Sequence, residues 1–230
     1  MLLQINNVKK TYKESAYVLK DICFDMNHQD KVAIIGKNGV GKSTLLKVIA
    51  GLLIPDEGEV LFQNNSLFNT PTSRRDIGFA FTEPVFYENL TVEENLIFLA
   101  SLYKLSSIKK IVKDKINEFN IHDYKNIKIS ALSSGMKQKV QICAATIHDP
   151  KLLIMDEPFN KLDSPSLNFL YSFISHFDGG VLFTSHDKEH IYTLATKIFI
   201  LKEGEIFYGM DYPSKVKSKD DFYEWYDSAL

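Results

Sequence analysis

The chain has 230 residues, 45% of them hydrophobic and 24% charged, a composition that excludes a disordered, collagen-like or low-complexity protein. Its 27 basic and 29 acidic residues give a formal charge of −2. Because proteins that hold nucleic acid usually carry a basic excess, we expect no nucleic acid as the main partner.

The first thirty residues predict antiparallel strands at the edge of the fold. Apolar residues alternate along them, at Leu3, Ile5 and Val8 and again at Val18, Ile22, Phe24 and Met26. The N-terminus lacks the basic start and apolar region of a secretory signal, and no apolar stretch reaches the ~18 to 20 residues of a membrane span. We therefore expect a cytoplasmic chain that reaches the inner face of a membrane only through a partner subunit.

Short apolar runs recur along the rest of the chain, with helical patterns between them. Several are apolar at consecutive positions, which is typical of strands buried on both faces of a parallel sheet. The runs are Val32–Ile35, Val60–Phe62, Ile77–Phe81, Leu152–Met155, Val181–Phe183 and Ile198–Leu201. The alternation of strands and helices indicates an α/β core.

A phosphate-binding pattern follows the first of these runs. Residues 36–43 fit G-x-x-x-x-G-K-[ST] in full and precede a predicted helix over 44–51. In such a loop the backbone amides and the helix N-terminus surround phosphate groups, Lys42 supplies a cation, and Ser43 can bind Mg²⁺. The candidate nucleotide-binding residues are Gly36, Lys37, Asn38, Gly39, Val40, Gly41, Lys42, Ser43 and Thr44.

Residues from about 84 to 148 are predicted to form a helical subdomain inserted between strands. Thr91 and Glu94 form a capping-box pattern at the start of a helix that runs through Tyr103. A second helix follows, with apolar residues from Ile108 to Phe119 at helical spacing and Lys109, Lys110, Lys113 and Lys115 mostly on the other face. We interpret these lysines as a solvated face rather than a binding patch.

Two further patterns carry polar groups that suit nucleotide chemistry. Leu132, Ser133, Ser134 and Gly135 open a helix whose N-terminus could hold a second anion. The apolar run 152–155 ends in Asp156 and Glu157, where Asp156 suits a Mg²⁺ shell and Glu157 can accept a proton from an attacking water. Two adjacent acids after a buried strand are hard to explain structurally, because each costs desolvation.

The segment Asn160-Lys161-Leu162-Asp163 matches the N-K-x-D pattern with which small GTPases recognise guanine. It follows Asp156 and Glu157 too closely to reach a base on the far side of the site. We therefore do not expect guanine specificity.

With Ser185-His186 after a later strand, the order of these motifs closely resembles the ATP-binding-cassette (ABC) ATPases, specifically the nucleotide-binding subunit of a membrane transporter, over essentially residues 2–209. The resemblance implies a P-loop NTPase core with a mostly parallel sheet, an N-terminal antiparallel β subdomain and the inserted helical subdomain. We expect one domain over 1–230, with a short C-terminal appendage over 210–230.

The resemblance also assigns individual residues. It places the signature motif at 132–136, with Ser134 and Met136 replacing its first glycine and its glutamine, and the D-loop at Leu162-Asp163. His186 stands at the switch histidine, and Tyr12 where the family stacks an aromatic ring on adenine. The Q-loop glutamine falls on Thr82, and Glu83 is the neighbour that could replace it.

On this resemblance, the chain hydrolyses ATP with Mg²⁺ and powers a transmembrane permease subunit. Ser133, Ser134 and Gly135 of one ATPase subunit close on the ATP of another, in a head-to-tail homodimer or heterodimer. Glu157 is the expected general base, and His186 holds the γ-phosphate and the water. Export is favoured over import, because a regulatory domain common in sugar importers is missing and residues 136–139 resemble exporter cassettes. The alternatives are a soluble ABC ATPase that acts on DNA or the ribosome, and a regulatory module that hydrolyses ATP weakly.

Overall fold

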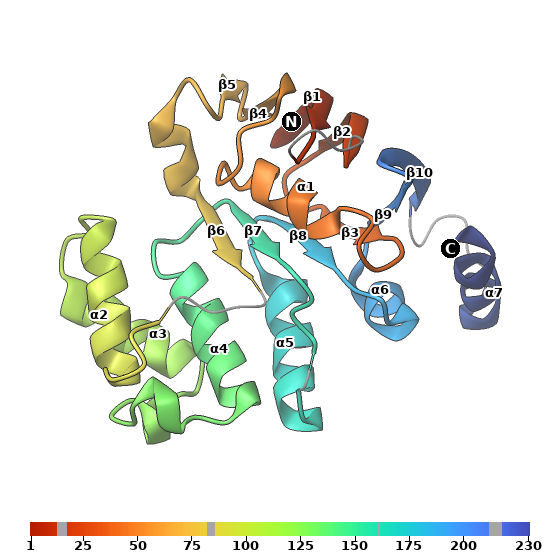
Figure 1. Ribbon diagram of the computed structural model, residues 1–230. Helices are drawn as coiled ribbons and strands as arrows, with labels where there is room; N and C mark the ends of the chain where they lie inside the picture. Colours follow the sequence, from red (N-terminus) through yellow and green to blue (C-terminus); the bar gives the residue numbers. More distant parts are fainter. Residues whose placement is uncertain (13–17, 82–85, 161, 212–217) are drawn as a thin grey trace.

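A computed structural model of the chain describes residues 1–12, 18–81, 86–160, 162–211 and 218–230. Within these residues the strands form two sheets, and helices pack around the larger one (Figure 1). The larger sheet has the strand order β10-β9-β3-β8-β7-β6, and the smaller sheet has the order β2-β1-β4-β5.

The larger sheet is the parallel core that the apolar runs predict. Five of its strands run parallel, and β10 pairs antiparallel with β9 at one edge. Every residue of β3, β7 and β8 is buried, as a sheet covered on both faces requires. The strands are β3 (Lys31–Ile35), β6 (Ile77–Ala80), β7 (Leu152–Met155), β8 (Gly180–Thr184), β9 (Lys197–Lys202) and β10 (Glu205–Asp211).

The smaller sheet is antiparallel, which confirms the prediction for the first thirty residues. The predicted strand at Val60–Phe62 belongs to this sheet, where Val60 and Phe62 are buried and Leu61 is half-buried. Its strands are β1 (Leu3–Lys10), β2 (Leu19–Met26), β4 (Glu57–Phe62) and β5 (Asn65–Ser66).

The larger sheet separates two hydrophobic cores. Along β3, Val32 and Ile34 pack with α1 (Lys42–Ile49) and the smaller sheet, whereas Ala33 and Ile35 pack with the helices of the opposite face. Successive side chains of a strand point to opposite faces, so this short strand contributes to both cores. The P-loop that follows β3 is thereby anchored from two sides.

The inserted helical subdomain contains α2 (Val92–Leu102), α3 (Ile108–Glu118) and α4 (Ser134–Ala145), with short 3₁₀ turns η2 (His122–Tyr124) and η3 (Ile129–Ala131) between α3 and α4. The capping box is confirmed: the Glu94 amide donates to Thr91 Oγ1 (3.2 Å), and the Thr91 amide donates to Glu94 Oε2 (2.8 Å). The approximate bounds of the subdomain, 84–148, remain a prediction.

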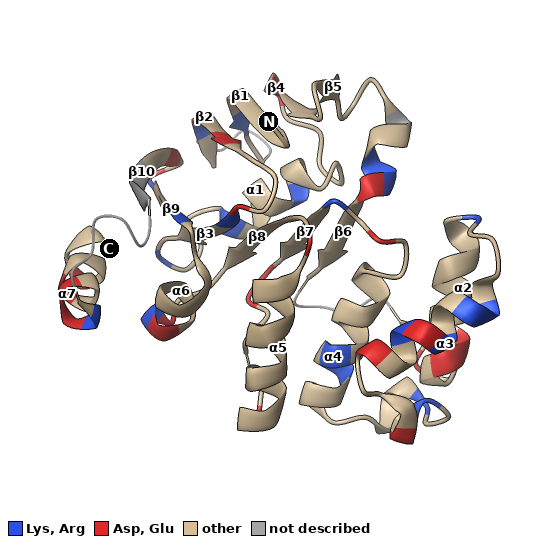
Figure 2. Cartoon of the chain, turned by 180° about the vertical axis from the view of Figure 1, so that it is seen from behind, with Lys and Arg blue, Asp and Glu red and all other residues tan. Residues whose placement is uncertain are grey.

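Basic and acidic residues share the surface of α3 (Figure 2). Lys109, Lys110 and Lys113 are exposed, as predicted. Lys115 differs, because its side chain is largely buried and its Nζ pairs with Glu118 (3.0 Å) and Asp149 (2.9 Å). It follows Lys113 by two residues and faces the loop that leads to β7.

The remaining helices are η1 (Pro71–Asp76), α5 (Ser164–His176), α6 (Lys188–Leu194) and α7 (Lys219–Ala229). The α7 helix lies within the predicted C-terminal appendage, yet Phe222 on it is fully buried. In the part of the chain that the structure describes, no helix combines the length and apolarity needed to cross a membrane.

Candidate active site

The P-loop joins the end of β3 to the start of α1, as its sequence pattern predicts. Gly39 and Gly41 have φ angles of +78° and +113°, a region that side chains other than glycine rarely adopt. At Gly36, a Cβ atom would lie 2.3 Å from the carbonyl oxygen of Leu201 on β9. The loop can therefore keep this path only with glycine at these positions.

Lys42 lies at the first position of α1 and is 7% exposed. Its Nζ donates to the carbonyl oxygens of Gly36 (2.7 Å) and Lys37 (3.1 Å), so the side chain folds back over the loop. Burial lowers the pKa of Lys42, and the nearby carboxylates of Glu157 and Asp156 oppose this shift. The loop thus holds a cation beside two acids.

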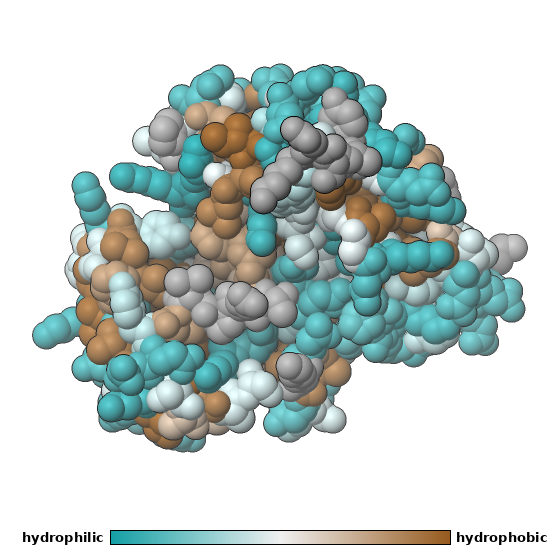
Figure 3. Space-filling model, in the orientation of Figure 1, coloured by the Kyte–Doolittle hydropathy of each residue, from teal (hydrophilic) through white to brown (hydrophobic). Residues whose placement is uncertain are grey.

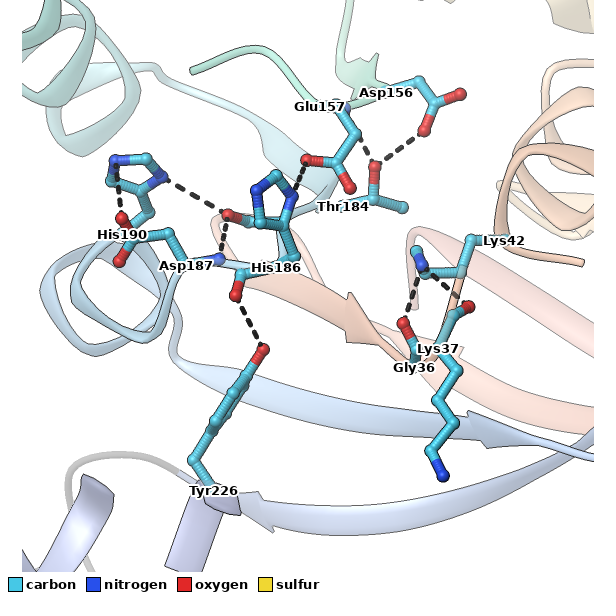
Figure 4. Close-up of polar contacts among 11 residues, drawn as sticks. Gly36, Lys37, Lys42, Asp156, Glu157, Thr184, His186, Asp187, His190 and Tyr226 are labelled. Carbon is cyan, nitrogen blue, oxygen red and sulfur yellow. Dashed lines mark hydrogen bonds and ion pairs between the residues drawn. The ribbon is translucent and has the colours of Figure 1, made fainter. Parts of the chain in front are cut away.

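Asp156 and Glu157 follow β7, and a threonine at the end of β8 connects them. Thr184 Oγ1 donates to Asp156 Oδ1 (2.7 Å) and accepts from the Glu157 amide (2.9 Å), as Figure 4 shows. Thr184 is fully buried and Asp156 is 6% exposed. Glu157 has a φ of +49°, a conformation that is uncommon for this residue type and frequent at functional sites. Its backbone is therefore held in an unfavourable conformation by its surroundings.

His186 approaches Glu157 from the segment between β8 and α6. Its Nδ1 lies 3.0 Å from Glu157 Oε2 (Figure 4). Since a carboxylate only accepts hydrogen bonds, Nδ1 carries the hydrogen of this contact. The His186 side chain is 62% exposed and that of Glu157 is 17% exposed, so the pair lies at the rim of the site.

One pocket of about 410 Å³ brings most of the predicted site residues together. Tyr12 is 47% exposed, and its hydroxyl lies 3.5 Å from Thr44 Oγ1. The pocket is lined by Tyr12, Val18, Asn38, Gly39, Gly41, Lys42, Ser43, Thr44, Asp156 and Glu157. Lys37 and Val40 line a neighbouring pocket instead, together with Ala229 and Leu230 at the end of the chain.

The predicted signature residues lie elsewhere in the chain. Ser133, Ser134 and Gly135 line a pocket of about 260 Å³ at the N-terminus of α4, together with Met136, Asp163 and Ser166. Ser133 caps α4 by accepting from the Met136 amide (3.3 Å), and Asp163 caps α5 by accepting from the Ser166 amide (3.0 Å). Among the described residues, this pocket and the P-loop pocket have no lining residue in common.

The oxygen atoms available near the P-loop suit a hard divalent cation. Ser43 and Asp156 line the same pocket and offer a hydroxyl and a carboxylate, which are ligands that Mg²⁺ accepts. Among the described residues there is no group of three or more His, Cys, Asp or Glu that could hold a metal ion alone. The residues therefore fit a Mg²⁺ ion that takes its remaining ligands from nucleotide phosphates and water.

The prediction that Thr82 or Glu83 replaces the Q-loop glutamine stays a prediction, because both residues lie outside the described residues. Thr184 was not among the predicted site residues. A signal for it was available, since it is a polar residue at the end of an apolar strand and directly precedes Ser185-His186.

A P-loop beside an acidic pair from another strand of the same parallel sheet defines a P-loop nucleoside triphosphatase. Within this class, the family model for the ABC transporter matches residues 19–160, and the chain belongs to that family as an ATP-binding subunit. ATP is its nucleotide and it is an ATP hydrolase.

Two curated relatives show the extent of the similarity. The ABC transporter ATP-binding protein NatA of Bacillus subtilis is 31% identical over 217 residues, 90% of this chain and 88% of NatA. The spermidine/putrescine import ATP-binding protein PotA of Mycoplasma capricolum is 31% identical over 211 residues, 89% of this chain but 60% of PotA.

Solved structures agree with the fold. An ATP-binding subunit of an ABC transporter superposes with a TM-score of 0.87 at 30% identity and covers 99% of this chain and 100% of that one. A dimeric ATP-binding cassette in a post-hydrolysis state, bound to ADP and Pi, gives a TM-score of 0.80 at 28% identity and covers 89% and 96%.

Proposed function

We propose that the chain binds Mg-ATP in the P-loop pocket and hydrolyses it with Glu157 as general base. The observation that carries this proposal is the pocket itself, which joins the acids after β7 to the P-loop. The loop amides and Lys42 hold the phosphates, Ser43 and Asp156 bind the Mg²⁺ ion, and Tyr12 stacks on adenine. When bound, the ion neutralises charge that develops on the phosphates.

Hydrolysis in this arrangement needs one proton acceptor beside the attacking water. The water oxygen bonds to the γ-phosphorus, the bond from that phosphorus to the ADP oxygen breaks, and Glu157 takes the proton that the water releases. His186 Nδ1 donates to Glu157 and orients its carboxylate, while the exposed remainder of the imidazole faces the γ-phosphate.

We propose further that each complete site needs two subunits arranged head to tail. The Ser133–Gly135 pocket is separate from the P-loop pocket of the same chain, and this separation supports the proposal. The amides at the N-terminus of α4 would then meet the γ-phosphate bound to the other subunit, whether that is a second copy or a different ATPase subunit.

Mixing two inactive variants tests the shared site. Lys42→Ala removes the phosphate cation, and Gly135→Glu puts a negative charge where the partner's phosphate would lie. If the chain forms homodimers, random pairing makes half of them mixed with one intact site of two, so a 1:1 mixture should regain about a quarter of the wild-type turnover. The proposal of a shared site would be contradicted if the mixture stayed inactive while the Gly135→Glu variant hydrolysed ATP on its own.

The membrane partner that we propose is a permease subunit, which would keep the chain on the cytoplasmic face. A groove between β6 and the helical subdomain offers a docking surface; its lining residues are Phe79, Phe81, Phe86, Leu99, Tyr103, Gln141, Ala144 and Ala145. Figure 3 shows hydrophobic side chains over β6 and α2. Phe79 is 38% exposed, and buried Gln141 Oε1 has no hydrogen-bond partner among the described residues.

This groove fits an amphipathic permease segment that inserts an apolar side chain and donates a hydrogen bond to Gln141. Phe79→Asp should abolish co-purification of the permease with a tagged chain and leave ATP affinity unchanged. Retention of the permease by this variant would place the docking surface elsewhere.

Export remains our prediction for the direction of transport, from the resemblance of residues 136–139 to exporter cassettes. The similarity to the import protein PotA, at 31% identity, favours import instead. Accumulation of substrate inside or outside sealed vesicles, with ATP supplied on the side of this subunit, distinguishes the two directions.

A further inference from the structure

The C-terminal helix α7 is firmly packed against α6. Phe222 is fully buried, and its ring centroid lies 5.4 Å from that of Tyr192 on α6. Tyr226, one turn further along α7, is 6% exposed. The helix therefore has a fixed place beside the segment that carries His186.

Polar contacts connect α7 to residues 186–189, where both helices carry charged residues of each sign (Figure 2). Lys188 pairs with Asp227 (2.9 Å), and Lys219 and Tyr223 both contact the Glu189 carboxylate. The side chains of the two ion pairs are 34–64% exposed, and exposed ion pairs contribute little each. One contact is of another kind: Tyr226 Oη donates to the main-chain carbonyl oxygen of His186 (3.2 Å), as Figure 4 shows.

The segment between β8 and α6 is held at three successive residues. Ser185 Oγ lies 3.3 Å from His190 Nδ1 and accepts from the Asp187 amide (3.1 Å). Asp187 caps α6 by accepting from the Glu189 amide (2.8 Å). At the residue between them, His186, the contact with Tyr226 restrains the backbone while the imidazole extends to Glu157.

The Tyr226 hydroxyl is suited to act as a permanent donor. Burial raises the pKa of Tyr226 to about 12, and the negative charge of Glu157 adds to the effect. The hydroxyl therefore keeps its hydrogen throughout the physiological pH range. A main-chain carbonyl can only accept, so the contact has one polarity at all these pH values.

We propose that Tyr226 is a positioning residue for ATP hydrolysis, which holds the His186 backbone so that the imidazole meets Glu157. The inference rests on the proposed roles of His186 and Glu157. It connects Tyr226 to the hydrolytic site although α7 lies beyond the family motifs. Because Tyr226 does not line the nucleotide pocket, its loss should affect the catalytic step and leave ATP binding intact.

Tyr226→Phe in the full chain tests this role, since it removes the hydroxyl and keeps the buried ring. We expect kcat to fall about fivefold to tenfold, the size of effect that one lost hydrogen bond can have, while KM and Kd for ATP and the melting temperature stay the same. Tyr223→Phe on the same helix is the matched control, because its hydroxyl contacts a side chain of α6. It should leave kcat unchanged.

His186→Ala separates failure of this inference from failure of the proposed function. In the His186→Ala background, Tyr226→Phe should have no further effect on kcat, since Tyr226 acts on Glu157 only through the His186 imidazole. If His186→Ala leaves turnover at the wild-type rate, the proposed role of His186 is wrong. If His186→Ala stops turnover but Tyr226→Phe does not slow it, or Tyr223→Phe slows it equally, Tyr226 has no positioning role.

Discussion

Lys42 and Tyr12 line the same pocket in different environments, and their substitutions should therefore differ in effect. Lys42 is buried beside two carboxylates, whereas nearly half of Tyr12 is exposed. A buried cation makes charge-assisted bonds to phosphate, while an aromatic ring stacks on any base.

We expect Lys42→Ala to weaken ATP binding roughly 100-fold. Tyr12→Ala should weaken it about fivefold and equally for ATP and GTP, because stacking does not depend on hydrogen-bond pattern. Titration with both nucleotides measures the effects, and Phe207→Ala, at an exposed ring outside the pocket, is the control. Unchanged affinities in Tyr12→Ala would mean that the adenine stacks elsewhere.

Single residues of the site differ in how far sequence alone predicts them. The glycines and Lys42 of the P-loop follow a fixed spacing, so their place next to β3 could be predicted. The link from Thr184 to Asp156 could not, because it depends on the register of β7 and β8, in which Met155 pairs with Phe183. Register between strands whose paired residues lie 28 positions apart in sequence has no local signature.

The strand β3 begins with Lys31, a charged residue at a buried position. Lys31 is 7% exposed, and its Nζ donates to the carbonyl oxygens of Phe177 (2.7 Å) and Gly179 (2.8 Å). Burial lowers the pKa of Lys31 to about 8, against the attraction of Asp178 and Asp30.

This shift makes stability depend on pH. Between about pH 8 and 10.5 the unfolded chain binds more protons at Lys31 than the folded chain, so the free energy of unfolding rises with pH in this window. Relative to Lys31→Met, wild-type stability should gain about 2 kcal/mol between pH 7.5 and 9.5. Urea unfolding of both proteins measures it, with exposed Lys47→Met as the control. Parallel pH curves for wild type and Lys31→Met would show that Lys31 titrates normally.

Among the elements, local sequence signals predicted α2 and the parallel strands well. The capping box fixes the start of α2, and uninterrupted apolar runs identify β3, β7 and β8. The contact of α7 with the site could not be predicted, because the mixed charges and aromatics of a terminal helix do not specify which surface it covers. Only the fold brings Tyr226 to His186, 40 residues earlier in the chain.

At the scale of the whole molecule, Glu157→Gln should convert the chain into an ATP-dependent dimer. The change removes the proposed base and a negative charge near the γ-phosphate while it preserves shape, so ATP still binds and closes the dimer but is not cleaved. We expect turnover to fall at least about 100-fold, within the range assigned to general base catalysis.

Size-exclusion chromatography with and without ATP measures this dimer. Glu93→Gln on α2, at a half-buried residue outside the pocket, is the control and should elute and hydrolyse as the wild type does. A Glu157→Gln variant that hydrolyses ATP at the wild-type rate would move the base to another residue.

The separation of the P-loop pocket from the Ser133–Gly135 pocket affects the kinetic order of the reaction. If each pocket is half of a site, dilute chains hold ATP without consuming it, and the hydrolysis rate grows with the square of the chain concentration. A membrane partner that tethers two chains replaces this dependence with a fixed, high effective concentration. ATP consumption would then be confined to assembled complexes, so that a surplus of free subunits wastes no nucleotide.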